Sequence, residues 1–152
     1  NKISENAVDI LFRTHGFRAS EERSAKKARE YLDLVGLADK AGIRARHLPY
    51  GQQKVLEIAR ALAQEPQLLL LDEPVAGLND TETAELSKIV RQIQGSGITV
   101  LMIEHDMRFV VSLSDWITVL NFGKKIAEGE PMDVIKRSEV VEAYLGGNAK
   151  YD

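Results

Sequence analysis

The sequence predicts an α/β fold organised around parallel strands. Two apolar runs, Leu68–Leu71 and Ile98–Ile103, flank a segment with helical periodicity, Thr81–Gln94. A short apolar run without alternation is typical of a strand that is buried on both faces of a parallel sheet. A strand, a helix and a second strand joined by short loops predict a right-handed parallel crossover.

The N-terminal third of the chain has a different pattern. Residues 1 to about 46 are polar, periodic at helical spacing and free of strand signals. One helix is expected to stop at Gly16, and a second to begin at the Ser20 cap and to stop at Gly36. We therefore predict a helical region, residues 1–46, followed by a region that contains the strands, residues 47–152.

Four further elements are predicted near the C-terminus. Trp116–Leu120 forms a third strand, with the tryptophan in the core, and Lys125–Ala127 a fourth strand that pairs with it through an antiparallel hairpin. Short helices are expected over Pro131–Ile135 and Glu139–Leu145.

Composition excludes several classes of protein. The 152 residues are 44% hydrophobic and 28% charged, as in an ordinary globular domain, and the net charge of −3 gives no reason to expect nucleic acid as the main partner. The absence of cysteine excludes disulfides and thiolate metal sites, and fits a reducing compartment. No apolar run approaches the roughly 20 residues that span a bilayer. The chain starts with neither methionine nor a signal peptide, so we expect a longer protein.

Titratable residues follow both predicted strands of the crossover. Asp72 and Glu73 come directly after the leucine run, and His105 comes shortly after the second strand. The carboxyl ends of strands in open α/β sheets are where ligands bind, so these side chains suggest a metal ligand beside a general base. Two solvated acids at a strand end are the alternative, and the flanking sequence favours the functional interpretation.

Turn and capping residues mark the helices that follow each strand. Gly77 permits a tight turn after the first strand. Asn79 and Glu82 have the spacing of a capping box at the start of the next helix. Asp106 is placed to cap a helix that begins near Met107.

A glycine-containing turn leads into the helix before the leucine run. The residues Leu48-Pro49-Tyr50-Gly51-Gln52-Gln53 precede apolar residues at helical spacing, and the helix is expected to stop before Pro66. Free amides and the helix dipole at such a terminus favour an anion. Many helices begin after glycine without binding anything, so this feature becomes informative only beside the others.

Together, these motifs resemble the nucleotide-binding subunits of ABC transporters. Leu48–Gln53 looks like the signature motif, Leu68–Glu73 like the Walker B strand, Ala76–Asn79 like the D-loop and His105 like the switch histidine. The tyrosine in the signature and the ending Val141–Gly146 resemble the ATP-binding subunits of branched-chain amino acid importers. Urea-type importers and lipopolysaccharide exporters share much of this pattern.

The resemblance implies a P-loop NTPase of the RecA-like type, in which residues 1–46 are part of the helical ABC subdomain and residues 47–152 the C-terminal part of the ATPase core. It implies ATP and Mg²⁺ as cofactors. Asp72 would hold Mg²⁺, Glu73 would polarise the attacking water, and His105 would contact the γ-phosphate. These roles match what phosphoryl transfer needs, namely positioning and charge stabilisation.

The remaining motif residues are implied to act across a dimer. Leu48 and Gly51 in the signature would serve ATP held by the opposite subunit, and Gln52 would support that loop. Gly77 and Asn79 in the D-loop would cross the interface. The implied partners are a second ATP-binding subunit, identical or not, and transmembrane permease subunits, which implies a cytoplasmic location on the inner face of the cell membrane.

The sequence departs from the family pattern in three places. Pro49 stands where the signature normally has serine, and Asn79 stands where the D-loop commonly has aspartate. The phosphate-binding loop G-x-x-x-x-G-K-S/T does not occur. We therefore expect these residues to be the C-terminal part of an ATPase and to bind ATP poorly on their own. The alternatives are a non-enzymatic scaffold and, less favoured, a metal-dependent hydrolase that uses Asp72, Glu73 and His105.

Overall fold

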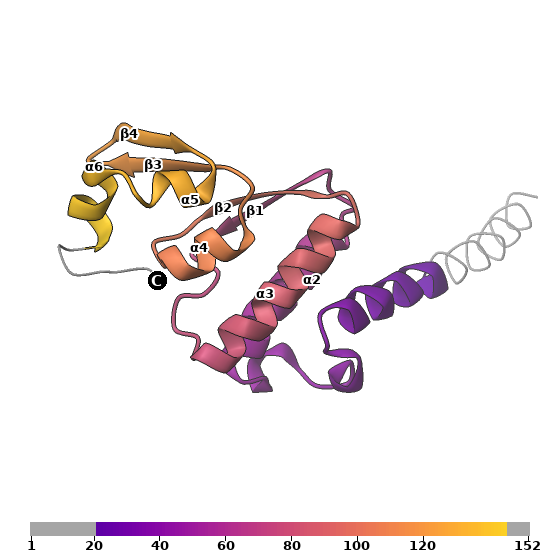
Figure 1. Ribbon diagram of the computed structural model, residues 1–152. Coiled ribbons are helices and arrows are strands. Elements are labelled where there is room, and N and C mark those ends of the chain that lie inside the picture. The colour runs from indigo at the N-terminus through magenta and orange to yellow at the C-terminus, as the bar shows by residue number, and fades with distance from the viewer. Residues whose placement is uncertain (1–20, 146–152) are drawn as a thin grey trace, which may run out of the picture. The chain divides into compact units, whose positions relative to one another are not determined.

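The structure is a computed structural model that describes residues 21–145 (Figure 1). The chain divides between Leu69 and Leu70 into two compact units. The predicted first helix, with its stop at Gly16, and the Ser20 cap lie outside the described residues.

The first described element is a helix over residues 21–34. It ends, as predicted, at Gly36, whose φ of 73° lies in the left-handed region that glycine adopts without strain. The Leu37 N–H donates to the Leu32 carbonyl at 2.7 Å, and the Gly36 N–H donates to the Asp33 carbonyl at 3.0 Å. These two bonds form a Schellman motif, which satisfies carbonyls at the end of the helix.

Two short 3₁₀ turns, η1 (Ala38–Lys40) and η2 (Ala45–His47), lead into helix α2 (Tyr50–Leu62). Helix α2 buries Ile58, Ala59 and Leu62 along one side, as its apolar spacing predicts. The Lys27 ammonium pairs with the Glu65 carboxylate just beyond α2, and this ion pair connects the first described helix with the end of α2.

Strands β1 (Leu68–Asp72) and β2 (Thr99–Ile103) are neighbours in a two-stranded sheet. The Glu73 N–H, just after β1, donates to the carbonyl of Ile103, the last residue of β2, at 2.9 Å. The carboxyl ends of the two strands therefore lie side by side, so the strands are parallel, as the sequence predicts. Figure 1 shows the chain passing from β1 through helix α3 (Asp80–Gly95) into β2.

Helix α3 confirms two sequence predictions. The Asn79 side chain accepts the Glu82 N–H at 3.0 Å, and the Glu82 carboxylate accepts the Asn79 N–H at 3.0 Å, which completes the capping box. The side chains buried by the helix are those of the predicted apolar stripe: Leu86, Ile89, Val90 and Ile93. Helix α4 (Met107–Leu113) begins at the predicted Asp106 cap, whose carboxylate accepts the Phe109 N–H at 3.0 Å.

The prediction that the leucine run is buried on both faces is wrong for this chain. Leu69 and Leu71 are buried, whereas Leu68 is 50% exposed and Leu70 is 64% exposed. Because side chains alternate along a strand, β1 buries one face and leaves the other open. Strand β2 likewise leaves Leu101 exposed. Within the described residues, the sheet is therefore covered on one face only.

Strands β3 (Ile117–Asn121) and β4 (Lys124–Gly129) form the predicted antiparallel hairpin. Its two-residue loop, Phe122-Gly123, has φ values of 45° and 75°, and two positive values are the mark of a type I′ turn. The predicted core position of Trp116 is wrong. It lies one residue before β3 and is 63% exposed, because the alternation of the strand begins with the buried Ile117.

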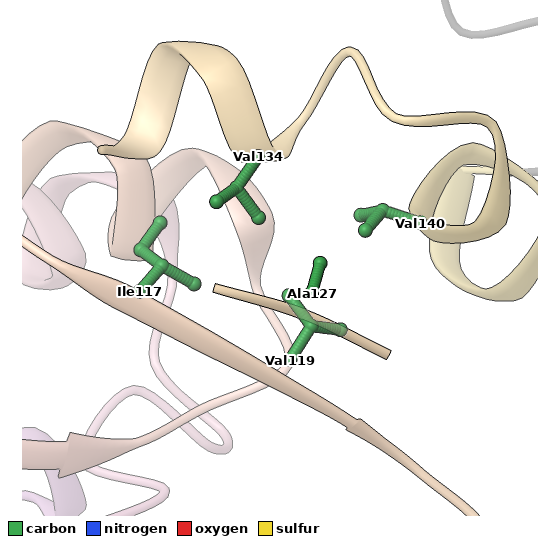
Figure 2. Close-up of a cluster of buried hydrophobic side chains, with 5 residues drawn as sticks. All are labelled: Ile117, Val119, Ala127, Val134 and Val140. Atoms are coloured by element: carbon green, nitrogen blue, oxygen red, sulfur yellow. The ribbon is translucent and has the colours of Figure 1, made fainter. Parts of the chain in front are cut away.

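Short helices cover one face of this hairpin. Helix α5 (Pro131–Val134) matches the first of the two predicted short helices. The second, predicted as one helix over Glu139–Leu145, is divided into α6 (Ser138–Val140) and one π-helical turn, η3 (Val141–Leu145). Figure 2 shows side chains from the helices pointing toward those of the strands, in a cluster of Ile117, Val119, Ala127, Val134 and Val140. None of the described helices combines the length and apolar character needed to cross a membrane.

Candidate functional site

The candidate site begins where β1 and β2 end together. Asp72 is the last residue of β1, and Glu73 follows it in the left-handed region with a φ of 44°. Non-glycine residues adopt this region in only a few per cent of cases. The bond from the Glu73 N–H to the Ile103 carbonyl holds this conformation against the end of β2. The chain thus turns sharply at the predicted base.

The structure brings Glu73 and His105 together, as their strand-end positions predict. His105 Nδ1 lies 3.5 Å from Glu73 Oε1. The side chains are 70% and 55% exposed for His105 and Glu73, so solvent or a ligand can reach both. A carboxylate beside an imidazole at an open strand edge can hold a water molecule and accept its proton.

Asp72 is exposed at the same strand end. Within the described residues, no three histidine, aspartate or glutamate side chains are grouped closely enough to form a metal site by themselves. Mg²⁺ is commonly bound through one or two carboxylates, with water and phosphate oxygens as its other ligands. An exposed single carboxylate at Asp72 fits a shared Mg²⁺ site of this kind.

The turn between Glu73 and α3 contains the two predicted D-loop residues. The Ala76 N–H donates to the Glu73 carbonyl at 3.2 Å, and Gly77 has a φ of 79°, which suits glycine. Asn79 uses its side chain as the cap of α3. Gly77 and Asn79 are both exposed, so this turn presents an accessible surface at the start of α3.

The signature residues belong to the other compact unit. Leu48 is buried, and its carbonyl accepts a bond from Gln53 Nε2 at 2.8 Å, which closes the turn ahead of α2. Gly51 is buried in the first turn of α2. Gln52 Oε1 is buried and has no hydrogen-bond partner among the described residues. Pro49, the N-cap, makes no side-chain capping bond to the helix amides.

Glu104 is a site residue that the sequence reasoning missed. It follows β2 and precedes His105, yet only 1% of its side chain is exposed. Its carboxylate accepts the backbone N–H groups of Val75 at 2.9 Å, His105 at 3.0 Å and Asp106 at 3.4 Å. The one available signal was an acidic residue directly after an apolar strand, and that signal does not reveal an inward side chain.

Comparisons with known proteins agree with this geometry. Residues 2–76 match the family model described as ABC transporter. This match confirms the predicted resemblance to the ABC transporter family. It is 42% identical over 145 residues to the high-affinity branched-chain amino acid transport ATP-binding protein BraF of Pseudomonas aeruginosa, covering 95% of this chain and 57% of BraF. It is 40% identical over 137 residues to LivG of Escherichia coli K12, a protein of the same description, covering 90% of this chain and 54% of LivG.

Solved structures give the same result for the fold. The ADP conformation of MJ1267, an ATP-binding cassette of an ABC transporter, matches with a TM-score of 0.75 and 34% identity, covering 82% of this chain and 50% of that one. A nucleotide-free ATP-binding cassette from an ABC transporter matches with a TM-score of 0.71 and 32% identity, covering 82% and 51%. The predicted P-loop NTPase fold class is confirmed. The chain spans just over half the length of the curated relatives named above.

Proposed function

We propose that this chain is the catalytic, C-terminal part of the ATP-hydrolysing subunit of an ABC importer for branched-chain amino acids. One observation carries the proposal. The contact between Glu73 and His105 lies at the joined ends of β1 and β2, in a chain 42% identical to BraF over 95% of its length. In the proposed division, residues 1–46 are part of the helical subdomain and residues 47–152 belong to the ATPase core.

Each exposed side chain at the strand ends has a proposed task. Bound ATP with Mg²⁺ would supply the phosphoryl group and neutralise charge on its oxygens. Asp72 would provide a carboxylate oxygen for the metal. Glu73 holds a water molecule and accepts its proton, and the φ of 44° directs the chain away after this residue. His105, 3.5 Å from Glu73, donates a hydrogen bond to an anionic oxygen beside that water.

The signature and D-loop residues are proposed to face a second ATP-binding subunit. Gly51 opens the first turn of α2 without a bulky side chain, and the helix dipole there favours an anion. Leu48 and Gln52 support that turn. Gly77 and Asn79 lie on the exposed turn before α3, where a second subunit could reach them. The other proposed partners are transmembrane permease subunits, with the subunit on the cytoplasmic face of the membrane.

A single substitution tests the proposed base. In the complete protein that contains this chain, Glu73→Gln should lower turnover by at least about a hundredfold, because an amide cannot accept the proton. Binding of ATP should persist, and size-exclusion chromatography with ATP should detect a trapped dimer. Glu85→Gln, at an exposed position on α3, is the matched control and should leave turnover unchanged.

Two outcomes would count against the proposal. Turnover of Glu73→Gln near the wild-type rate would remove Glu73 as the base. A complete wild-type protein without Mg-ATP hydrolysis would instead favour the non-enzymatic scaffold. The transported solute needs a separate assay, in which leucine, methionine and urea are compared as stimulants of ATPase activity with the permease and the binding protein present.

A further inference from the structure

We infer that Glu104 is a positioning residue that locks the loops after β1 and β2 together, so that Glu73 and His105 face each other. This inference rests on the proposed function for its catalytic consequence. Its structural part depends only on contacts within residues 70–152.

The two oxygens of Glu104 bind different loops. Oε1 accepts the Val75 N–H, in the turn after β1, at 2.9 Å. Oε2 accepts the His105 N–H at 3.0 Å and the Asp106 N–H at 3.4 Å, both in the loop after β2. One carboxylate therefore joins two segments that lie 29 residues apart in the sequence.

These contacts hold the backbone at Glu73 and two residues after it. Its own N–H is bound by the carbonyl of Ile103, and the N–H of Val75, two residues on, is bound by the carboxylate of Glu104. Adjacent residues of the β2 end thus hold the backbone on both sides of Glu73. Because Glu73 occupies the left-handed region, this backbone would relax toward other conformations if one anchor were lost.

The chemistry of the contact explains why a carboxylate is needed. A carboxylate with 1% of its side chain exposed is costly unless it is hydrogen-bonded, and three backbone N–H groups supply those bonds. The facing titratable group is His105, whose Nδ1 lies 3.8 Å from Glu104 Oε2. A glutamine would offer one acceptor oxygen and an NH₂ group that cannot accept, so it could keep only one of the two loops. An aspartate is one methylene shorter and would hold the loops less well.

Hydrogen exchange in the 152-residue chain tests the structural part. In Glu104→Gln, protection of the Val75 or His105 amide should fall by about tenfold or more, while amides of the β3–β4 hairpin keep their protection. Glu85→Gln, the exposed control on α3, should leave all of them unchanged. Unchanged protection at both Val75 and His105, or an equal loss throughout the chain, would overturn the inference.

Kinetics of the complete protein test the catalytic part. Glu104→Gln should lower kcat about ten- to a hundredfold, with KM for ATP within about twofold, because misplacing a base by about 1 Å costs rate more than binding. Glu104→Asp should recover part of the loss. Wild-type kcat in Glu104→Gln would refute the positioning role. A wild-type protein without ATPase activity would refute the proposed function instead, and the exchange experiment would still decide whether Glu104 joins the loops.

Discussion

Neighbouring leucines in β1 allow a direct test of which face of the sheet is buried. Leu71 is 8% exposed, whereas Leu70 is 64% exposed. Replacing a buried leucine with alanine removes transferred apolar surface and leaves a cavity, which costs about 2–5 kcal/mol. Full burial of a leucine side chain contributes about 1.5–3 kcal/mol, and Leu70 has only about a third of its surface buried, so Leu70→Ala should cost about 0.5–1 kcal/mol.

The assay is urea unfolding of the 152-residue chain followed by far-ultraviolet circular dichroism. Leu71→Ala should lower the free energy of unfolding by at least about 1 kcal/mol more than Leu70→Ala, with equal m-values for the two variants. These substitutions are matched in chemistry and in strand, so local β-propensity cancels between them. Equal costs for both variants would refute the assignment of one open face.

Leu70→Ala and Leu71→Ala also test whether another segment covers the open face of β1 in the complete protein. In the complete protein, a segment equivalent to the remaining length of BraF or LivG would be available to pack on β1. The cost of Leu70→Ala should then rise toward the range for buried leucines, about 2–5 kcal/mol. A cost that stays below about 1 kcal/mol in the complete protein would contradict burial on both faces.

Two other predictions concern helix ends. Asn79→Ala removes the side-chain acceptor of the capping box at α3 and should lower the free energy of unfolding by about 0.5–2 kcal/mol, measured by urea titration; no loss would show that Glu82 alone secures the helix start. The hydrogen bond and charge of Glu65 raise the pKa of Lys27 above its ordinary value of 10.5. Because the folded pKa is the higher one, this stabilisation should be complete below about pH 10.5 and disappear as the pH rises through the folded value. Glu65→Gln should remove that alkaline dependence of stability, and an unchanged profile would contradict the assignment.

Local signals in the sequence were enough for the elements and for the chemical types at the site. The Asn79–Glu82 capping box, the Asp106 cap and the Gly36 stop involve residues at most a few positions apart, so short-range spacing defines them. The positions of Glu73 and His105 at the same sheet edge also followed from the order of strand, helix and strand. Their 3.5 Å contact confirms that expectation.

Tertiary structure decided which side chains face inward. A run of four leucines has no internal sign of which face is covered, and only the packing of the described residues shows that Leu69 and Leu71 are buried while Leu70 is not. The exposed Trp116 is a similar case, since its burial depends on where the strand alternation starts.

The strand ends show the same division between sequence and structure. The sequence by itself determined that acids and a histidine follow β1 and β2, because these residue types and the element order are read along the chain. Only the tertiary structure decided that Glu104 turns inward to bind the amides of Val75, His105 and Asp106. Those partners include a residue 29 positions away, so the bond exists only once the two strands have paired.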